Sequence, residues 1–289
     1  MPTASTTVRW TLAWKRPSKT RSCSPAKLAA TACLLFASAP GLWAQAAEPD
    51  PALASPPPAA TIKAPLIAAF QRDQEALLNY QHREHVSTDK DGAVDNRTLR
   101  VWYVNGHEVS ETIALDNREL SAAELAAEHQ RALQRAQDAR SRPAPPTGVI
   151  VFEGYSYPFA KLADDYVYTN PQARIWQGRE IWVYQAHPDP KAPARSRAET
   201  LLLHSQGEVW VDAADMHIIR IALHTTAPVH YGLGLLATIH QATLELDLQR
   251  QSPRVWLPAK ADFHLRATVL LVHPLARSKT QNYSAYSPN

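Results

Sequence analysis

The feature that most limits the possible folds is a long run of alternating apolar and polar residues between Gly207 and Leu271. Every second residue is apolar over 242–250, and the pattern resumes over 261–271 after a break at 251–254. Because successive side chains of a strand point to opposite faces, this pattern predicts an antiparallel sheet with one apolar and one polar face. The apolar face must be covered. Its members here are Ala242, Leu244, Leu246, Leu248, Ala261, Phe263, Leu265, Ala267, Val269 and Leu271.

Two helices are predicted before this region. An amphipathic helix is expected over residues 65–80, because Leu66, Phe70 and Leu77 share one face. A second is expected over 121–140, where Ser121 and Glu124 form a capping box. Its apolar stripe is thin, so the pattern fits a mobile flap and an ordinary surface connector equally well.

Between and after these helices, further strands are predicted. Residues 80–87, 97–104 and 108–115 form a meander, with Asn105-Gly106 as a tight hairpin turn. Shorter strands are expected at 148–153, 166–168 and 179–186, followed by a proline-rich loop at 187–197. Longer ones follow at 207–212 and 216–224. The predicted class is therefore α+β, mainly β.

The first 46 residues resemble a cleavable secretory signal. They contain six Lys or Arg and no acid, an apolar segment over 28–39, and a small-x-small sequence that ends at Ala46. The apolar segment is too short to span a membrane. We therefore expect export to the periplasm with cleavage near Ala46. Residues 47–62, rich in Ala and Pro, are expected to be an extended tether, and residues 63–289 a single domain.

Removal of this leader changes the composition that bears on function. Residues 47–289 carry 24 basic and 27 acidic residues, a net charge of −3, so the sequence gives no support for a nucleic-acid partner. Both cysteines, Cys23 and Cys33, lie in the leader. The exported chain thus has no disulfide, thiolate nucleophile or cysteine metal ligand. No later apolar run reaches the roughly 20 residues of a transmembrane helix.

A set of landmarks follows the same order as in one known family. They include Gly207-Glu208-Val209-Trp210-Val211-Asp212, Gly232-Leu233-Gly234, Trp256-Leu257-Pro258 and Tyr283-Ser284-Ala285-Tyr286. In this order the chain, from Pro65 to Tyr286, resembles the outer-membrane lipoprotein carrier superfamily, the LolA-like fold. It is most similar to the uncharacterised secreted members. The resemblance implies a strongly curved antiparallel half-barrel wrapped round the N-terminal helix, with an apolar cavity between them.

The resemblance also implies a hydrophobic ligand, a lipid or a lipoprotein acyl chain, and envelope proteins as further partners. This chain has no segment that matches the carriers' receptor-binding loops, so lipoprotein transport itself is not carried over. We expect the cavity, if open, to lie opposite the first helix, with the helix over 121–140 as a lid. Its predicted lining is Trp182, Tyr184, Ile219, Ile221, Leu244, Leu246, Leu248, Phe263, Leu265 and Val269. A solid core made by the same side chains is the equally supported alternative.

The motifs of catalytic and metal sites are missing from the sequence. His82 and His85 lie three apart on a predicted strand and so face opposite ways, which argues against a shared metal. There is no Gly-x-Ser-x-Gly elbow and no phosphate-binding glycine loop. We expect neither catalytic residues nor a metal nor a cofactor. The predicted function is non-catalytic binding of a hydrophobic ligand in the periplasm. An envelope scaffold with a solid core and a cryptic hydrolase are the alternatives.

Overall fold

The computed structural model describes residues 53–152, 155–194 and 196–289. The predicted signal and the first residues of the predicted tether lie outside this part of the chain. The helices are the 3-10 helix η1 (Ala59–Thr61) and the α-helices α1 (Lys63–Leu77), α2 (Ala122–Arg140), α3 (Phe159–Asp164) and α4 (Arg197–Leu202). The strands are β1 (Tyr80–Lys90), β2 (Ala93–Val104), β3 (His107–Leu115), β4 (Arg118–Glu119), β5 (Val149–Phe152), β6 (Tyr155–Pro158), β7 (Tyr166–Trp176), β8 (Arg179–Pro188), β9 (Ser205–Asp212), β10 (Ile218–Thr225), β11 (Val229–Tyr231), β12 (Ala237–Ser252), β13 (Val255–Val269) and β14 (His273–Pro288).

One antiparallel sheet dominates the described chain. Its strand order is β4-β3-β2-β1-β14-β13-β12-β10-β9-β8-β7, with β11 added to β12, while β5 and β6 form a separate hairpin. The sheet is strongly curved and does not close, because its two edge strands, β4 and β7, are not paired with each other. The predicted half-barrel of mainly β structure is confirmed.

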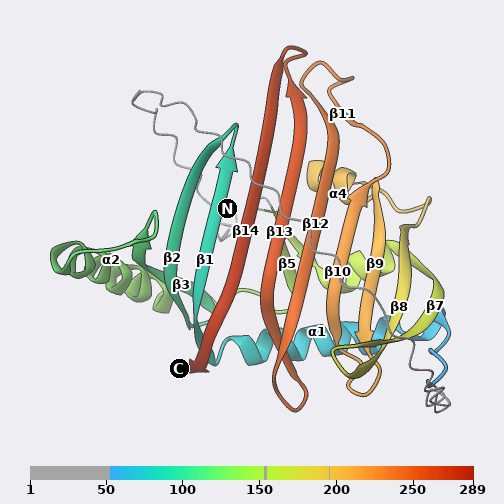
Figure 1. Ribbon diagram of the computed structural model, residues 1–289, viewed down its shortest axis with the longest axis horizontal. Coiled ribbons are helices and arrows are strands. Elements are labelled where there is room, and N and C mark those ends of the chain that lie inside the picture. Colours follow the sequence, from blue (N-terminus) through green and yellow to red (C-terminus); the bar gives the residue numbers. More distant parts are fainter. Residues whose placement is uncertain (1–52, 153–154, 195) are drawn as a thin grey trace, which may run out of the picture. The chain divides into compact units, whose positions relative to one another are not determined.

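The last strand joins the two halves of this sheet. β14 lies between β1 and β13 and pairs with both along most of its length (Figure 1). It connects the N-terminal meander to the strands that alternate most clearly in the sequence. No strand was predicted there, because residues 273–288 are mostly polar and small and show no regular alternation.

The face of the sheet that contacts α1 is called the inner face below. Leu66 of α1 packs in one buried cluster with side chains of β8, β9, β10 and β12. Phe70 of the same helix stacks on Phe159 of α3, with ring centroids 4.2 Å apart. α1 therefore has the predicted place against the apolar face, and it begins and ends within three residues of the predicted limits.

The second helix, α2, begins where it was predicted to begin, but it packs on the side of the sheet opposite to α1. The capping box of Ser121 and Glu124 is formed. Ala136 and Ala139 of α2 pack on Val109 of β3, with Trp102 of β2 beside them. Val101 and Tyr103 of β2 point to the inner face. Trp102 lies between them and is opposite Val109 in the register of β2 and β3, so Trp102 and Val109 point to the other face. The prediction that α2 is a lid over the inner-face residues is therefore wrong.

Part of the predicted tether contacts the domain. Ile62 is completely buried in the cluster that also holds Leu66. The hydroxyl of Tyr184 on β8 donates a hydrogen bond to the carbonyl oxygen of Pro57, 3.0 Å away. Residues 53–62 thus lie along the end of the inner-face core and extend the contact that α1 makes.

Candidate functional site

Seven of the ten predicted lining residues come together under α1. They belong to one cluster, in which Tyr184 is completely buried and Ile219 is 1% exposed. Side chains of α1 and of the segment before it fill the space between the helix and β8–β12. The solid-core alternative therefore holds for this half of the inner face. The seven residues are Trp182, Tyr184, Ile219, Ile221, Leu244, Leu246 and Leu248.

The remaining three predicted residues lie further along β13. Phe263 and Leu265 pack against a second cluster, which contains Leu201 of α4 and Val229 of β11. Val269 is the half-buried last residue of β13. The structure thus divides the predicted site between two clusters instead of one cavity. The gap where the clusters meet, lined by Leu202, Leu223, Leu244 and Phe263 among others, measures only about 10 Å³.

Four apolar side chains on the inner face remain half-buried between the coverings of α1 and α4. We call these residues, Leu244, Leu246, Phe263 and Leu265, the inner strip. Leu244 lies directly opposite Phe263 in the register of β12 and β13, so the strip is continuous across both strands. It is the part of the predicted site where apolar surface still meets solvent.

Aromatic and titratable side chains continue the inner face beside this strip. Ala261 of β13 is opposite Leu246 on one side and opposite Gln281 of β14 on the other. Two residues further along β14, Tyr283 is opposite Glu84 of β1. Next to Tyr283 stand three further rings that form the tyrosine group with it. This group consists of His82, Tyr103, Tyr283 and Tyr286.

The tyrosine group is tightly packed around a buried imidazole. The His82 ring lies 5.0 Å from the ring centroid of Tyr286, 5.7 Å from that of Tyr283 and 6.5 Å from that of Tyr103. Glu84, 3% exposed, accepts a hydrogen bond from the side-chain amide of Gln281. Burial raises the pKa of Glu84 and, with the neighbouring carboxylates, raises the pKa of Tyr283 well above its usual value. The tyrosine hydroxyls of the group are therefore neutral at neutral pH, and that of Tyr286 donates a hydrogen bond to the carbonyl oxygen of Pro258, 2.8 Å away.

Sequence reasoning missed this group. In the sequence, His82 stands out only through its spacing from His85, which argues against a shared metal, and Tyr283 and Tyr286 stand out only as landmarks of the resemblance. The group is assembled by pairing of β1 with β14, about 200 residues away along the chain. A pattern within one strand cannot reveal such a neighbour.

The stability of the protein should depend on pH through His82. Burial lowers the pKa of His82 to about 4 from an ordinary value of 6.5. As the pH falls from 6.5 towards 4, the unfolded chain binds a proton that the folded protein does not. We therefore expect the free energy of unfolding to fall by up to about 3 kcal/mol over this interval, and no such loss above it.

Urea unfolding of His82→Phe across this pH range tests the prediction. The phenyl ring keeps the aromatic packing and removes the titrating group. The fall in the free energy of unfolding between pH 6.5 and pH 4 should therefore disappear in this variant. His85→Phe is the matched control, because His85 lies on the same strand with its side chain on the other face, against Thr98. If the free energy of unfolding of His82→Phe fell towards pH 4 as much as that of the wild type, the assignment to His82 would be contradicted. Glu84 acts in the opposite direction, since its raised pKa lowers stability as the pH rises above its ordinary range.

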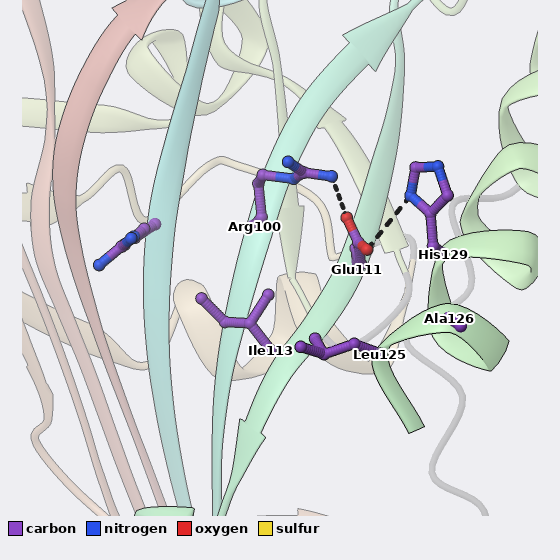
Figure 2. Close-up of a pocket in the computed structure, with 7 residues that line it drawn as sticks. Arg100, Glu111, Ile113, Leu125, Ala126 and His129 are labelled. Carbon is purple, nitrogen blue, oxygen red and sulfur yellow. Dashed lines mark hydrogen bonds and ion pairs between the residues drawn. The ribbon is translucent and has the colours of Figure 1, made fainter. Parts of the chain in front are cut away.

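A larger hollow lies on the other face of the sheet, beneath α2. It has a volume of about 440 Å³, and Ile113, Leu125 and Ala126 form its apolar part. Figure 2 shows Glu111 of β3 between Arg100 of β2, with which it forms an ion pair, and His129 of α2, whose Nδ1 lies 3.3 Å from a carboxylate oxygen of Glu111. Glu111 is only 5% exposed, so Arg100 balances the charge of a buried carboxylate, and the contact with His129 joins α2 to the sheet. The polar groups of this hollow thus have a structural task.

Arg220, between Ile219 and Ile221, faces away from the inner face. It forms ion pairs with Asp247 at 3.0 Å and Glu245 at 2.6 Å. Its guanidinium carbon lies 5.5 Å from the ring centroid of Trp210. This orientation leaves the inner strip without a cation at this position.

No group of three or more His, Cys, Asp or Glu side chains within 53–152, 155–194 and 196–289 is placed to hold a metal ion. In the same ranges, no helix combines the length and apolar character needed to cross a membrane.

Comparison with known proteins gives structural similarities only. The sequence matches no family model, and no curated protein sequence matches it significantly. Among solved structures, a lipoprotein-sorting protein domain from Vibrio parahaemolyticus is 10% identical, with a TM-score of 0.32, over 77% of this chain and 91% of that one. A DUF1329 family protein from Desulfovibrio piger is also 10% identical, with a TM-score of 0.31, over 80% of this chain and 93% of that one.

A third similar structure is the complex of MucA and MucB from Pseudomonas aeruginosa. The matched chain is 7% identical, with a TM-score of 0.22, over 77% of this chain and 98% of that one. A lipoprotein-sorting domain is thus among the structures that this chain is similar to. At these identities and TM-scores, the similarities identify neither a ligand nor a partner for it.

Proposed function

We propose that this protein is a non-catalytic binding protein of the periplasm that holds the acyl chain of a lipid or lipoprotein on its inner face. One observation carries the proposal: the apolar side chains of the inner strip are only half-buried, beside the packed cluster under α1. Burial of a methylene group stabilises a complex by about 0.8 kcal/mol, so a few groups placed on this strip suffice for useful affinity. The leader of residues 1–46 is the support for export.

The surroundings of the inner strip favour an amphiphile over a purely apolar ligand. The chain would lie along Leu244, Leu246 and Phe263, and the head group would reach the hydroxyls of the tyrosine group. These hydroxyls are in surroundings of low polarity, where a hydrogen bond contributes more than it does in water. The packed cluster under α1 supports a ligand that lies along the strip, which agrees with the solid-core alternative for that half of the inner face.

Titration with a fluorescent acyl probe, after removal of co-purified lipid, tests the proposal. The wild type should bind the probe saturably, and Leu246→Arg should weaken binding about tenfold or more, because it places a charge on the strip. His264→Arg is the matched control. It adds the same side chain on the neighbouring strand β13, at an exposed position of the other face. Its affinity should equal that of the wild type.

The outcome also decides between this proposal and the scaffold alternative. Absence of co-purified lipid in native mass spectrometry, together with absence of saturable probe binding by the folded wild type, would refute the proposal. The packed core under α1 would then point to an interaction module that binds envelope proteins on its surface. Equal weakening by Leu246→Arg and His264→Arg would also count against the inner strip, because charge alone would then explain the effect.

A further inference from the structure

Six large aliphatic side chains are exposed at one end of the sheet, and we call them the apolar tip. They lie on the turn between β11 and β12 and on the turn between β13 and β14, at the end of these strands away from α1 (Figure 1). Their exposed fractions are 97% for Leu233, 56% for Leu235, 50% for Leu236, 58% for Leu270, 62% for Leu271 and 71% for Val272. Soluble surfaces carry single exposed leucines often, but seldom a continuous group of this size.

The two turns form one surface. The backbone N–H of Leu270 donates a hydrogen bond to the carbonyl oxygen of Leu236, 3.1 Å away. Directly below it, Ala237 and Val269 are partners in the ladder of β12 and β13. The strands thus hold both turns side by side, and their apolar side chains project from the same end of the sheet.

The conformation of these turns is unusual for leucine. Leu233, Leu270 and Leu271 have φ values of 56°, 50° and 64°, in the left-handed region that β-carbon sterics disfavour. Glycine or asparagine would occupy these positions at lower energy. Leu236 packs over Gly232, where an added β-carbon would come within 2.6 Å of its side chain. Strained leucines that a fixed backbone points into solvent suggest a function for these side chains.

The charge of the adjoining strands indicates what the tip contacts. No Asp or Glu occurs in residues 225–244 or 263–282, which contain Arg266, Arg277 and Lys279 and four histidines. Of these three cations, Arg266 on β13 is exposed, whereas Arg277 and Lys279 on β14 are half-buried. Asp91 of the β1–β2 turn approaches this part of the chain, where it accepts a hydrogen bond from the N–H of Ala276. The apolar tip is therefore bordered by a predominantly basic region.

These observations favour a lipid bilayer over a protein as the partner. Centres of protein interfaces are enriched in Trp, Tyr and Arg and contain few leucines, whereas the tip is purely aliphatic. Hydrocarbon accepts such side chains without hydrogen bonds, and a cation such as Arg266, four residues before Leu270 on β13, can approach anionic head groups. We propose that the apolar tip inserts into the surface of a bilayer that contains anionic lipids. This contact does not depend on a ligand on the inner strip.

Vesicle co-sedimentation of the processed protein tests the proposal. Vesicles of phosphatidylethanolamine with phosphatidylglycerol should bind the wild type, and vesicles of phosphatidylcholine should bind it more weakly. The double variant Leu235→Glu with Leu271→Glu should bind the anionic vesicles at least about tenfold more weakly, since two side chains can no longer enter hydrocarbon. Ile175→Glu on β7 is the matched control, because Ile175 is also aliphatic and 57% exposed but lies far from the tip in the strand order. It should bind like the wild type.

A second variant gives a readout that does not rely on loss of binding. The indole of Leu271→Trp should shift its fluorescence to the blue and be quenched by brominated lipids when anionic vesicles are added. Absence of wild-type binding to both kinds of vesicle would overturn the proposal, and so would equal loss of binding in Ile175→Glu. Dimers in sedimentation velocity that the double variant abolishes, together with no indole shift on vesicles, would overturn it as well and identify a second copy as the partner.

Discussion

Replacement of Asp73 by alanine is expected to lower the free energy of unfolding by about 4 kcal/mol. Asp73 belongs to α1 and is 7% exposed. One of its carboxylate oxygens lies 2.7 Å from Nδ1 of His217, which is completely buried. The other accepts a hydrogen bond from the backbone N–H of Trp256, at 3.0 Å. The variant would leave both of these buried groups without their partner, and α1 would lose its polar attachment to the sheet.

Urea denaturation of two further variants separates the hydrogen bonds from other effects of the change. Asp73→Asn keeps an oxygen for the N–H of Trp256, so it should lose about half as much stability as Asp73→Ala. Glu75→Ala changes an exposed carboxylate on the same helix and should stay within about 0.5 kcal/mol of the wild type. If Asp73→Ala were no less stable than Glu75→Ala, the buried contacts would contribute nothing and α1 would be held by its apolar face alone.

Replacement of Gly207 by alanine is expected to lower stability by at least about 3 kcal/mol. Gly207 lies in β9 opposite Leu223 of β10. A β-carbon built on it would come within 1.8 Å of the carbonyl oxygen of Ala222 and 2.8 Å of its carbonyl carbon. Both atoms belong to the backbone, so relief of the clash requires the two strands to separate. β10 also pairs with β12, so the displacement would reach the centre of the sheet.

A second glycine provides the control for this variant. Gly178, in the turn between β7 and β8, has a φ of +74°, and no other atom lies within 4 Å of the position that an added β-carbon would take. Gly178→Ala should cost only about 1 kcal/mol, because it strains one turn without a clash. Thermal unfolding of the two variants should therefore rank Gly207→Ala well below Gly178→Ala. The reverse order would mean that β9 and β10 can separate at little cost.

The local elements were predictable because their signals lie within a few residues. The period of two in residues 242–250 predicted β12, and the pair Asn105-Gly106, with φ values of 50° and 75°, forms the predicted hairpin turn. The reciprocal hydrogen bonds of Ser121 and Glu124 begin α2 as predicted. The same kind of signal, Ser196 with Glu199, starts α4 and was overlooked inside a proline-rich segment. In each case the favoured backbone conformation depends on near neighbours alone.

The candidate site was predictable only in part. The ten predicted residues do lie on apolar faces of strands, and nine of them join the two inner-face clusters. Whether a ligand or the protein itself covers them was undetermined, because an alternating pattern specifies an apolar face and not what fills the space above it. Leu248 is 8% exposed beneath α1, whereas Leu246, two residues away on the same strand, remains half-buried.

The sequence by itself determined α1, α2, the strands with clear alternation and the Asn105-Gly106 turn, since these follow from local geometry and from the segregation of apolar from polar side chains. Only the tertiary structure decided that β14 joins the two halves of the sheet, that α2 lies on the outer face, and that Asp73 meets His217 and Trp256. Such contacts join residues up to about 200 positions apart, and their choice depends on the packing of the whole inner face. The tyrosine group and the apolar tip arise in this way, from strands and turns that are neighbours only in the folded protein.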